Sequence, residues 1–171
     1  MQSYSDTPQV LRDFLSYHET IKGQSRLTVS EYYLDLRLFF RFLKLMRCQL
    51  PYHTDPETID IRDIDLEFLR SVSISEIFDF LSYLSNDRET DEGHGLGAAA
   101  RARKLSAIKS FYKYLTVRTK QLDVNPVKDI EFPKIRKSLP RYLTLEESRR
   151  LLSAVEGRNA KRDYAILLLF L

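Results

Sequence analysis

One amphipathic helix, predicted over residues 98–115, constrains this chain more than any other feature. Ala, Leu, Arg and Lys dominate the stretch, and no Gly or Pro interrupts it. At about 100° per residue, one face is apolar and consists of Leu105, Ile108, Phe111, Tyr112 and Leu115. Such a face has to be buried against other elements, so the sequence predicts a packed helical domain organised around this helix.

The opposite face of this helix is small, hydroxylated and basic. It consists of Ala99, Ala102, Arg103, Ser106, Lys109, Ser110 and Lys113. Small residues let a helix backbone approach a DNA duplex, hydroxyls bond phosphate oxygens, and Arg or Lys reaches phosphates or guanine edges. The alternative interpretation is the solvated face of an ordinary amphipathic helix.

The distribution of charge favours a nucleic-acid contact. The net charge of +3 is made up of −7 over residues 1–97, +8 over residues 98–137 and +2 over residues 138–171. A basic block of this density is typical of a nucleic-acid interface, although acidic partners of other kinds would also fit it.

Three further helices are predicted before the basic block. The first covers residues 8–22 and ends at Gly23, which suits a left-handed cap. The second runs from a capping box at Thr28 and Glu31 to about Arg47. The third covers residues 75–84. Their predicted inward residues are Val10, Leu11, Phe14, Leu15 and Tyr17 in the first, Val29, Tyr32, Tyr33, Leu36, Phe39, Phe40 and Leu43 in the second, and Ile74, Ile77, Phe78, Leu81 and Leu84 in the third. The other side of the second helix offers Ser30, Leu34, Arg37, Arg41 and Lys44, so two basic helix faces could straddle one groove.

The connections between these helices are predicted to be irregular. Residues 49–72 contain Pro51, Pro56 and six acidic residues between Asp55 and Glu67, which indicates a solvated loop turned away from DNA, then a short helix near residues 65–70. The acidic spacing matches no calcium loop. Residues 86–97 contain three glycines without the strand or the Gly-Lys-Ser/Thr of a phosphate loop, and are expected to form a flexible hinge.

The basic helix is followed by a linker and the beginning of a second domain. The linker over residues 119–140 has no apolar periodicity, and Pro133 and Pro140 flank a charged segment. A second capping box, Thr144 and Glu147, opens a helix to about Val155, with Leu151, Leu152 and Val155 inward. A buried helix is expected over residues 162–171, and because the chain ends inside this apolar run we expect a truncated domain.

The composition excludes several classes of protein. The amino end is polar and unlike a signal peptide, and the longest apolar run is too short to span a membrane. The single cysteine, Cys48, precludes an internal disulfide and fits a reducing, cytoplasmic location. No metal or cofactor motif is present.

The order of the motifs resembles the amino-terminal part of tyrosine recombinases, with Xer-like integrases the most similar. The motifs are TVSEYYLDLRLFFRFLK, ISEIFDFLSYL, ARARKLSAIKSFYKYL and NPVKDIEFPKIRKSLPRYLTLEESRRLL. The resemblance implies an all-α fold: a SAM-like helical bundle, the core-binding domain, at residues 1–118, a linker at 119–140, and the first helices of a truncated catalytic domain at 141–171. It also implies double-stranded DNA as partner, and other recombinase subunits in a tetrameric synapse of the full-length protein, with no membrane.

The chemistry of the family uses a Tyr nucleophile that forms a 3′-phosphotyrosyl bond, with Arg, Lys and His residues stabilising the phosphate. The resemblance places the first catalytic Arg just beyond Leu171, so no catalytic residue, cofactor or metal is assigned to this chain. The expected activity of this fragment is DNA binding without cleavage.

DNA contacts are implied by element. Family members place the helices that match residues 28–44 and 99–113 against the major groove, and the linker along the backbone. The candidate DNA-binding residues are Thr28, Arg37, Arg41, Arg101, Arg103, Lys104, Ser106, Lys109, Lys134, Arg136 and Lys137. Two alternatives stay open: a non-enzymatic helical DNA-binding regulator, and a SAM-like protein-interaction module that uses Leu34 and Leu38.

Overall fold

The computed structural model describes residues 6–51, 54–86, 89–90, 93–135 and 142–171. The regular structure of the described chain is helical apart from one short hairpin, which confirms the predicted all-α class. Its α-helices are α1 (Gln9–Ser16), α2 (Arg26–Arg47), α3 (Leu66–Arg70), α4 (Ile74–Asn86), α5 (Ala98–Lys113), α6 (Leu145–Ser153) and α7 (Ala160–Phe170). Single π-helical turns, Tyr17–Ile21 and Tyr114–Arg118, extend α1 and α5, and a 3-10 turn covers Pro56–Thr58.

The described residues divide into two compact units, one up to Ile135 and one from Tyr142 onward. The first unit contains α1 to α5, and the second contains α6 and α7.

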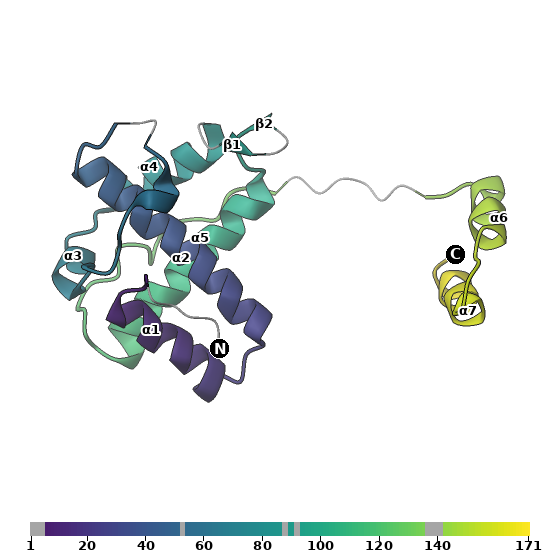
Figure 1. Cartoon of the computed structure of the whole chain (residues 1–171), viewed down its shortest axis with the longest axis horizontal. Coiled ribbons are helices and arrows are strands. Elements are labelled where there is room, and N and C mark those ends of the chain that lie inside the picture. Colours follow the sequence, from purple (N-terminus) through teal and green to yellow (C-terminus); the bar gives the residue numbers. More distant parts are fainter. Residues whose placement is uncertain (1–5, 52–53, 87–88, 91–92, 136–141) are drawn as a thin grey trace. The chain divides into compact units, whose positions relative to one another are not determined.

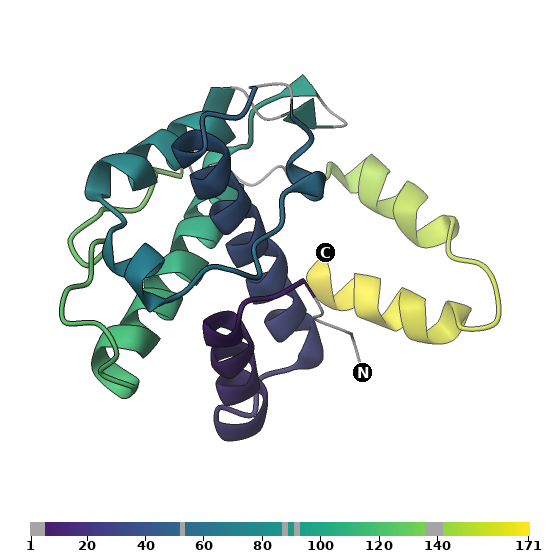
Figure 2. The same ribbon diagram turned by 60° about the vertical axis from the view of Figure 1, so that its left-hand side comes forward.

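Two long helices form the centre of the first unit. α2 crosses α5 in both ribbon views (Figures 1 and 2), and the predicted apolar face of α5 is fully buried at this crossing. Phe40 of α2 meets Phe111 of α5 edge-on, with ring centroids 5.5 Å apart. Phe14 of α1 packs on Phe111 at 5.3 Å, and Phe80 of α4 packs on Phe39 at 5.1 Å. Aromatic side chains therefore join all four long helices into one core.

The predicted helix ends are partly right. Gly23 has a φ of 61°, as expected for the residue that ends the first helical segment. The predicted capping box at Thr28 is wrong: the N-cap of α2 lies three residues earlier, because the Ser25 side chain accepts from the Thr28 backbone N–H at 3.2 Å and caps the helix. The second capping box is confirmed, since Thr144 and Glu147 exchange both hydrogen bonds.

The acidic segment between α2 and α4 is not the solvated loop that was expected. Its short helix α3 lies where the sequence predicts it, with Asp65 as N-cap. The residues before it, however, pack on the domain: Ile59, Ile61 and Ile64 are all buried. This alternation of isoleucines with acidic residues holds the segment against the unit with its carboxylates outward.

The next two segments also differ from prediction. In α4, Ile74 and Phe78 are 47% and 52% exposed, while Phe80 takes the inward place instead. A short antiparallel hairpin pairs Glu89–Thr90 with Gly93–His94 in the connection that was predicted to be a plain hinge.

The segment after α5, which was predicted to be a linker, packs against the first unit. Leu122, Val127 and Ile130 are buried in the first unit. The apolar residues of this segment are spaced irregularly, so helical or strand periodicity could not have found them.

In the second unit, α6 and α7 form where the sequence predicts helices. Neither helix contains a buried residue, so the expected burial of residues 162–171 is not seen in the described chain. Leu151, predicted inward, is 39% exposed.

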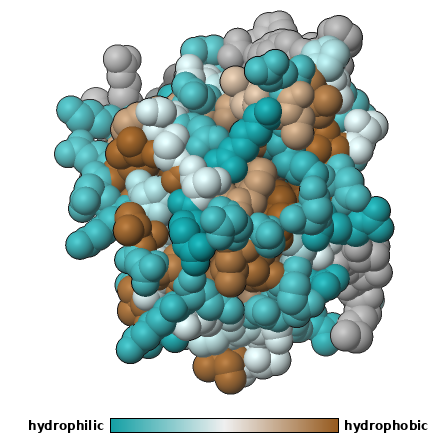
Figure 3. Space-filling model, turned by 90° about the vertical axis from the view of Figure 1, so that its left-hand side faces the viewer, coloured by the Kyte–Doolittle hydropathy of each residue, from teal (hydrophilic) through white to brown (hydrophobic). Residues whose placement is uncertain are grey.

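The helices that the structure describes are too short or too polar to span a lipid bilayer. On the side of the molecule that faces the viewer in Figure 3, apolar side chains form separate patches among hydrophilic ones.

Candidate nucleic-acid interface

The outer face of α5 presents the predicted mixture of small, hydroxyl and basic side chains. Arg103, Ser106 and Lys113 are exposed, and Lys109 and Ser110 are partly exposed. Their common face follows from the helical period, because the residues between them build the buried face at the crossing with α2. The structure therefore brings the candidate DNA-binding residues Arg103, Ser106 and Lys109 onto one open helix surface, together with Ser110 and Lys113.

The carboxyl-terminal end of this surface is reinforced by the segment after α5. The Lys109 Nζ donates to the Lys128 carbonyl at 3.0 Å and lies 5.4 Å from the centroid of the Phe132 ring. A depression of about 530 Å³ is lined here by Lys109, Lys113, Thr116, Val117, Asp123, Asn125 and Lys128. Three lysines and one aspartate line this depression, and the resulting excess of positive charge favours an anionic ligand.

The other residues predicted near this surface differ in their access to a ligand. Arg101 is partly buried and donates from Nη1 to the Ser85 hydroxyl at 3.0 Å; its buried Nε has no partner among the described residues. Lys134 is exposed in the segment that leaves the first unit. Arg136 and Lys137 lie outside the described residues.

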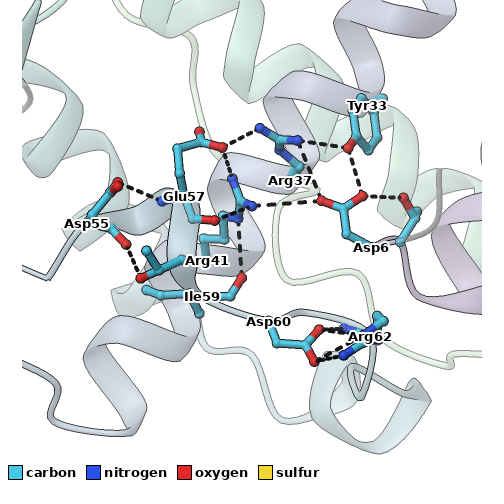
Figure 4. A network of polar contacts seen from close by, with 11 residues as sticks. Asp6, Tyr33, Arg37, Arg41, Asp55, Glu57, Ile59, Asp60 and Arg62 are labelled. Atoms are coloured by element: carbon cyan, nitrogen blue, oxygen red, sulfur yellow. Dashed lines mark hydrogen bonds and ion pairs between the residues drawn. The ribbon is translucent and has the colours of Figure 1, made fainter. Parts of the chain in front are cut away.

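On α2, the predicted basic face is largely covered by the acidic segment, as Figure 4 shows. The Glu57 carboxylate accepts from Arg37 Nη2 and from Arg41 Nη1, at 2.5 Å in each case. Arg37 also donates to the Tyr33 hydroxyl at 2.9 Å, and that hydroxyl donates to Asp6 at 2.9 Å. Burial raises the pKa of Tyr33, so the phenol stays protonated as a donor in this network.

Arg41 is a clear correction to the predicted interface. Its side chain is buried, 6% exposed, and donates to the carbonyls of Ile59 and Glu57 at 3.3 and 2.8 Å. The isoleucines of the acidic segment place these carbonyls over the helix, which a helical wheel of α2 alone cannot reveal. Arg41 is therefore a structural cation in this state, not an open contact for DNA.

The next two basic residues of α2 are also paired, Lys44 with the same acidic segment and Arg47 with α4. Lys44 Nζ donates to the Asp60 carbonyl at 2.7 Å and to Asp63 at 2.6 Å. Arg47 pairs with Glu76 of α4 at 2.7 Å, and this hydrogen bond is the main reason why the pKa of Glu76 is lowered. Thr28, at the other end of α2, is partly exposed and hydrogen-bonds the Ser25 hydroxyl at 2.9 Å.

A compact charge cluster joins α2 to α5. Asp35 is 2% exposed, and its Oδ1 accepts from Lys104 Nζ at 2.7 Å. Its Oδ2 lies 3.1 Å from Nη1 of Arg103, and the Glu31 carboxylate contacts the same Nη1. Lys104, a predicted DNA contact, is only 7% exposed, so its ammonium is occupied within the fold. The cluster borders a pocket of about 310 Å³ whose lining also includes Leu34, Leu38, Arg37 and Glu57.

Sequence reasoning missed the acidic partners in both networks. Glu31 and Asp35 are four residues apart on α2, so they share the helix face that meets α5. Glu57, Asp60 and Asp63 repeat every three residues and match Arg37, Arg41 and Lys44 in charge and number. Both patterns were present in the sequence, but their pairing depends on tertiary contacts.

The arrangement suits binding of an extended anion better than catalysis. Among the described residues, no group of three or more His, Cys, Asp and Glu side chains is placed to hold a metal ion. Tyr112, the most deeply buried tyrosine, donates to the Leu69 carbonyl at 3.2 Å, and burial raises its pKa. Among the predicted DNA-contacting cations that the structure describes, those with exposed donors lie on α5 and in the segment after it.

Comparison with known proteins finds relatives that are named tyrosine recombinases. The chain is 40% identical over 164 residues to a protein named tyrosine recombinase XerC from Caldanaerobacter subterraneus, covering 96% of this chain and 45% of the relative. It is 35% identical over 160 residues to a XerC of Myxococcus xanthus, covering 92% and 44%. It is 30% identical over 149 residues to a XerD of Halalkalibacterium halodurans, covering 87% and 42%.

No family model and no solved structure matches this chain. The chain spans less than half the length of the curated relatives named above. Over about 95% of its own length, it is homologous to the amino-terminal portion of the tyrosine recombinases XerC and XerD.

Proposed function

We propose that this chain is the DNA-binding portion of a site-specific tyrosine recombinase. In this proposal the first unit is a SAM-like core-binding domain, and α6 and α7 begin a catalytic domain. The full-length protein cuts and rejoins duplex DNA through a 3′-phosphotyrosyl intermediate, together with other recombinase subunits. The homology to XerC and XerD supports this assignment.

The single observation that carries the proposal is the open face of α5. It combines exposed cations, hydroxyls and small residues on one helix, and three lysines surround the depression at its end. Small side chains allow the helix to enter a groove, while the lysines lie where a phosphate backbone could follow.

The proposed surface is narrower than the sequence suggested. Arg103, Ser106, Lys109 and Lys134 remain candidate DNA contacts, and Lys113 and Lys128 join them by exposure. On α2, the cations Arg37, Arg41 and Lys44 pair with carboxylates of the acidic segment. We therefore place the main DNA contact on α5. On α2, only the partly exposed amino-terminal turn at Thr28 remains a candidate contact.

A protein-interaction module is the second candidate. Leu34 is 45% exposed on α2, and Ile74 and Phe78 are four residues apart and exposed on α4. Exposed apolar side chains of this kind would also suit contacts between recombinase subunits.

Two matched substitutions test the proposal. Arg103 and Arg70 are 47% and 53% exposed; Arg103 pairs with Glu31 and Asp35 and Arg70 with Glu67, but only Arg103 lies on α5. We expect Arg103→Ala to weaken duplex binding by about 5- to 150-fold and Arg70→Ala by less than about twofold. Fluorescence anisotropy with the whole chain measures both. Equal and negligible effects in folded variants would place the DNA elsewhere.

A further inference from the structure

We infer that Asp35 is a positioning residue that fixes Arg103 to read a guanine edge, an inference that rests on the proposed DNA-binding function. Asp35 lies on α2 and Arg103 on α5, so one carboxylate links the two helices at the candidate interface. The sequence singled out Glu31 only as a helix-capping residue and did not single out Asp35.

The geometry of the guanidinium carries the first step. Both carboxylates contact the same nitrogen, Nη1 of Arg103. No described residue accepts a hydrogen bond from its Nε or Nη2. The Nε–Nη2 edge of an arginine is a rigid pair of donors, and it matches the O6 and N7 acceptors that guanine presents in the major groove.

The anchor itself is buried and paired. The Asp35 side chain is 2% exposed and is held through its other oxygen by the Lys104 ammonium at 2.7 Å. A guanidinium that is fixed before binding loses less side-chain entropy when it meets a base. Lys104 thus contributes to the interface indirectly, by holding the carboxylate that holds Arg103.

Local charge decides between a base and a phosphate as the ligand of Arg103. Glu31, Asp35, Arg103 and Lys104 sum to zero net charge, so this cluster neutralises no phosphate overall. The two carboxylates would repel a phosphate that approached Arg103, whereas a neutral guanine edge meets no such repulsion. The neighbours Ala99 and Ser106, one turn away on either side, leave room for a base edge.

The test begins with selection from a library of short duplexes that have a randomised central segment, using the whole chain. Anisotropy on the selected duplex, and on versions with one base pair changed, gives the discrimination at each position. We expect Arg103→Ala to remove a preference for G·C at one position, by roughly 5- to 150-fold, with little change in the salt slope.

Asp35→Asn is then expected to lower discrimination at that same position by about fivefold or more, and to add no further loss in the Arg103→Ala background. Asp79→Asn is the control, because it makes the same charge change at an exposed position of α4. If Asp35→Asn does not fold because it leaves the Lys104 ammonium buried without a carboxylate, the double variant Asp35→Asn/Lys104→Gln replaces it, since it removes the buried pair together.

The outcomes separate the two proposals. Unchanged discrimination in a folded Asp35→Asn, or in Asp35→Asn/Lys104→Gln where that variant replaces it, would overturn the positioning role while leaving DNA binding intact. An even loss of affinity over all sequences in Arg103→Ala, with a salt slope reduced by about one, would make Arg103 a phosphate contact and overturn the inference. Absence of duplex binding by the unmodified chain would overturn the proposed function itself.

Discussion

At the scale of single residues, burial decides what each charged side chain does. Arg41 and Arg103 both sit on helices that were predicted to face DNA, but Arg41 is 6% exposed and Arg103 is 47% exposed. A buried cation needs its partners because its desolvation is costly, so Arg41 and Lys104 are committed to carbonyls and carboxylates of the fold. Only the exposed cations keep donors available for a ligand.

His18 gives a prediction at this scale. Its ring packs on Phe14 with centroids 4.4 Å apart, and its Nδ1 lies 2.7 Å from the Gln24 side-chain oxygen. Burial lowers the pKa of His18 from 6.5, so the unfolded chain binds its proton more readily than the folded one. Stability is therefore retained above about pH 6.5 and falls as the pH drops below it, by at most about 1.4 kcal/mol per pH unit.

Urea denaturation of the whole chain between about pH 7.5 and 5.5 measures this loss. In His18→Phe, which keeps an aromatic ring and removes the titration, we expect a distinctly flatter profile over this range. Parallel profiles for the two proteins would show that His18 has no part in the pH dependence.

At the scale of elements, the sequence predicted single helices better than the contacts between them. The period of apolar residues in α5 was enough to identify its buried face, and Thr144 with Glu147 was enough to identify the start of α6. The cover over α2 could not be predicted in this way, because its buried carbonyls and isoleucines belong to a segment without helical period. Thr28 was mistaken for a cap because Ser25, three residues earlier, offers the same hydroxyl chemistry.

The contrast between α2 and α5 leads to a paired prediction. Arg41→Gln removes donors to the Glu57 carboxylate and to two carbonyls, so we expect a loss of about 1.5–3 kcal/mol in the free energy of unfolding and no change in the salt slope of DNA binding. Lys113→Gln, on the open face of α5, is expected to change stability by less than about 0.5 kcal/mol. It should reduce the salt slope by about 0.9.

Urea denaturation and anisotropy on the same two variants provide the measurements. A lower salt slope in Arg41→Gln would mean that the acidic segment leaves α2 when DNA binds. In that case the original expectation of two basic helix faces would be restored.

At the scale of the whole molecule, acidic and basic residues are concentrated in different parts of the sequence, and the fold brings some of them together as ion pairs. The −7 of residues 1–97 includes the carboxylates that cover α2, while the +8 of residues 98–137 includes α5 and the segment after it. Lys109, Lys113, Lys128 and Lys134 have no carboxylate partner among the described residues. Within residues 98–135, the exposed cations without a carboxylate partner therefore lie toward the carboxyl-terminal end of α5 and in the segment after it.

The most direct test of the central claim is the salt dependence of duplex binding by the whole chain. If those four lysines each neutralise one phosphate, the logarithm of the binding constant should fall against the logarithm of salt concentration with a slope of about −3 to −4. Anisotropy between about 50 and 300 mM salt measures this slope. A slope in that range is the result we predict, and a slope near zero would contradict the assignment of this chain as a DNA-binding portion.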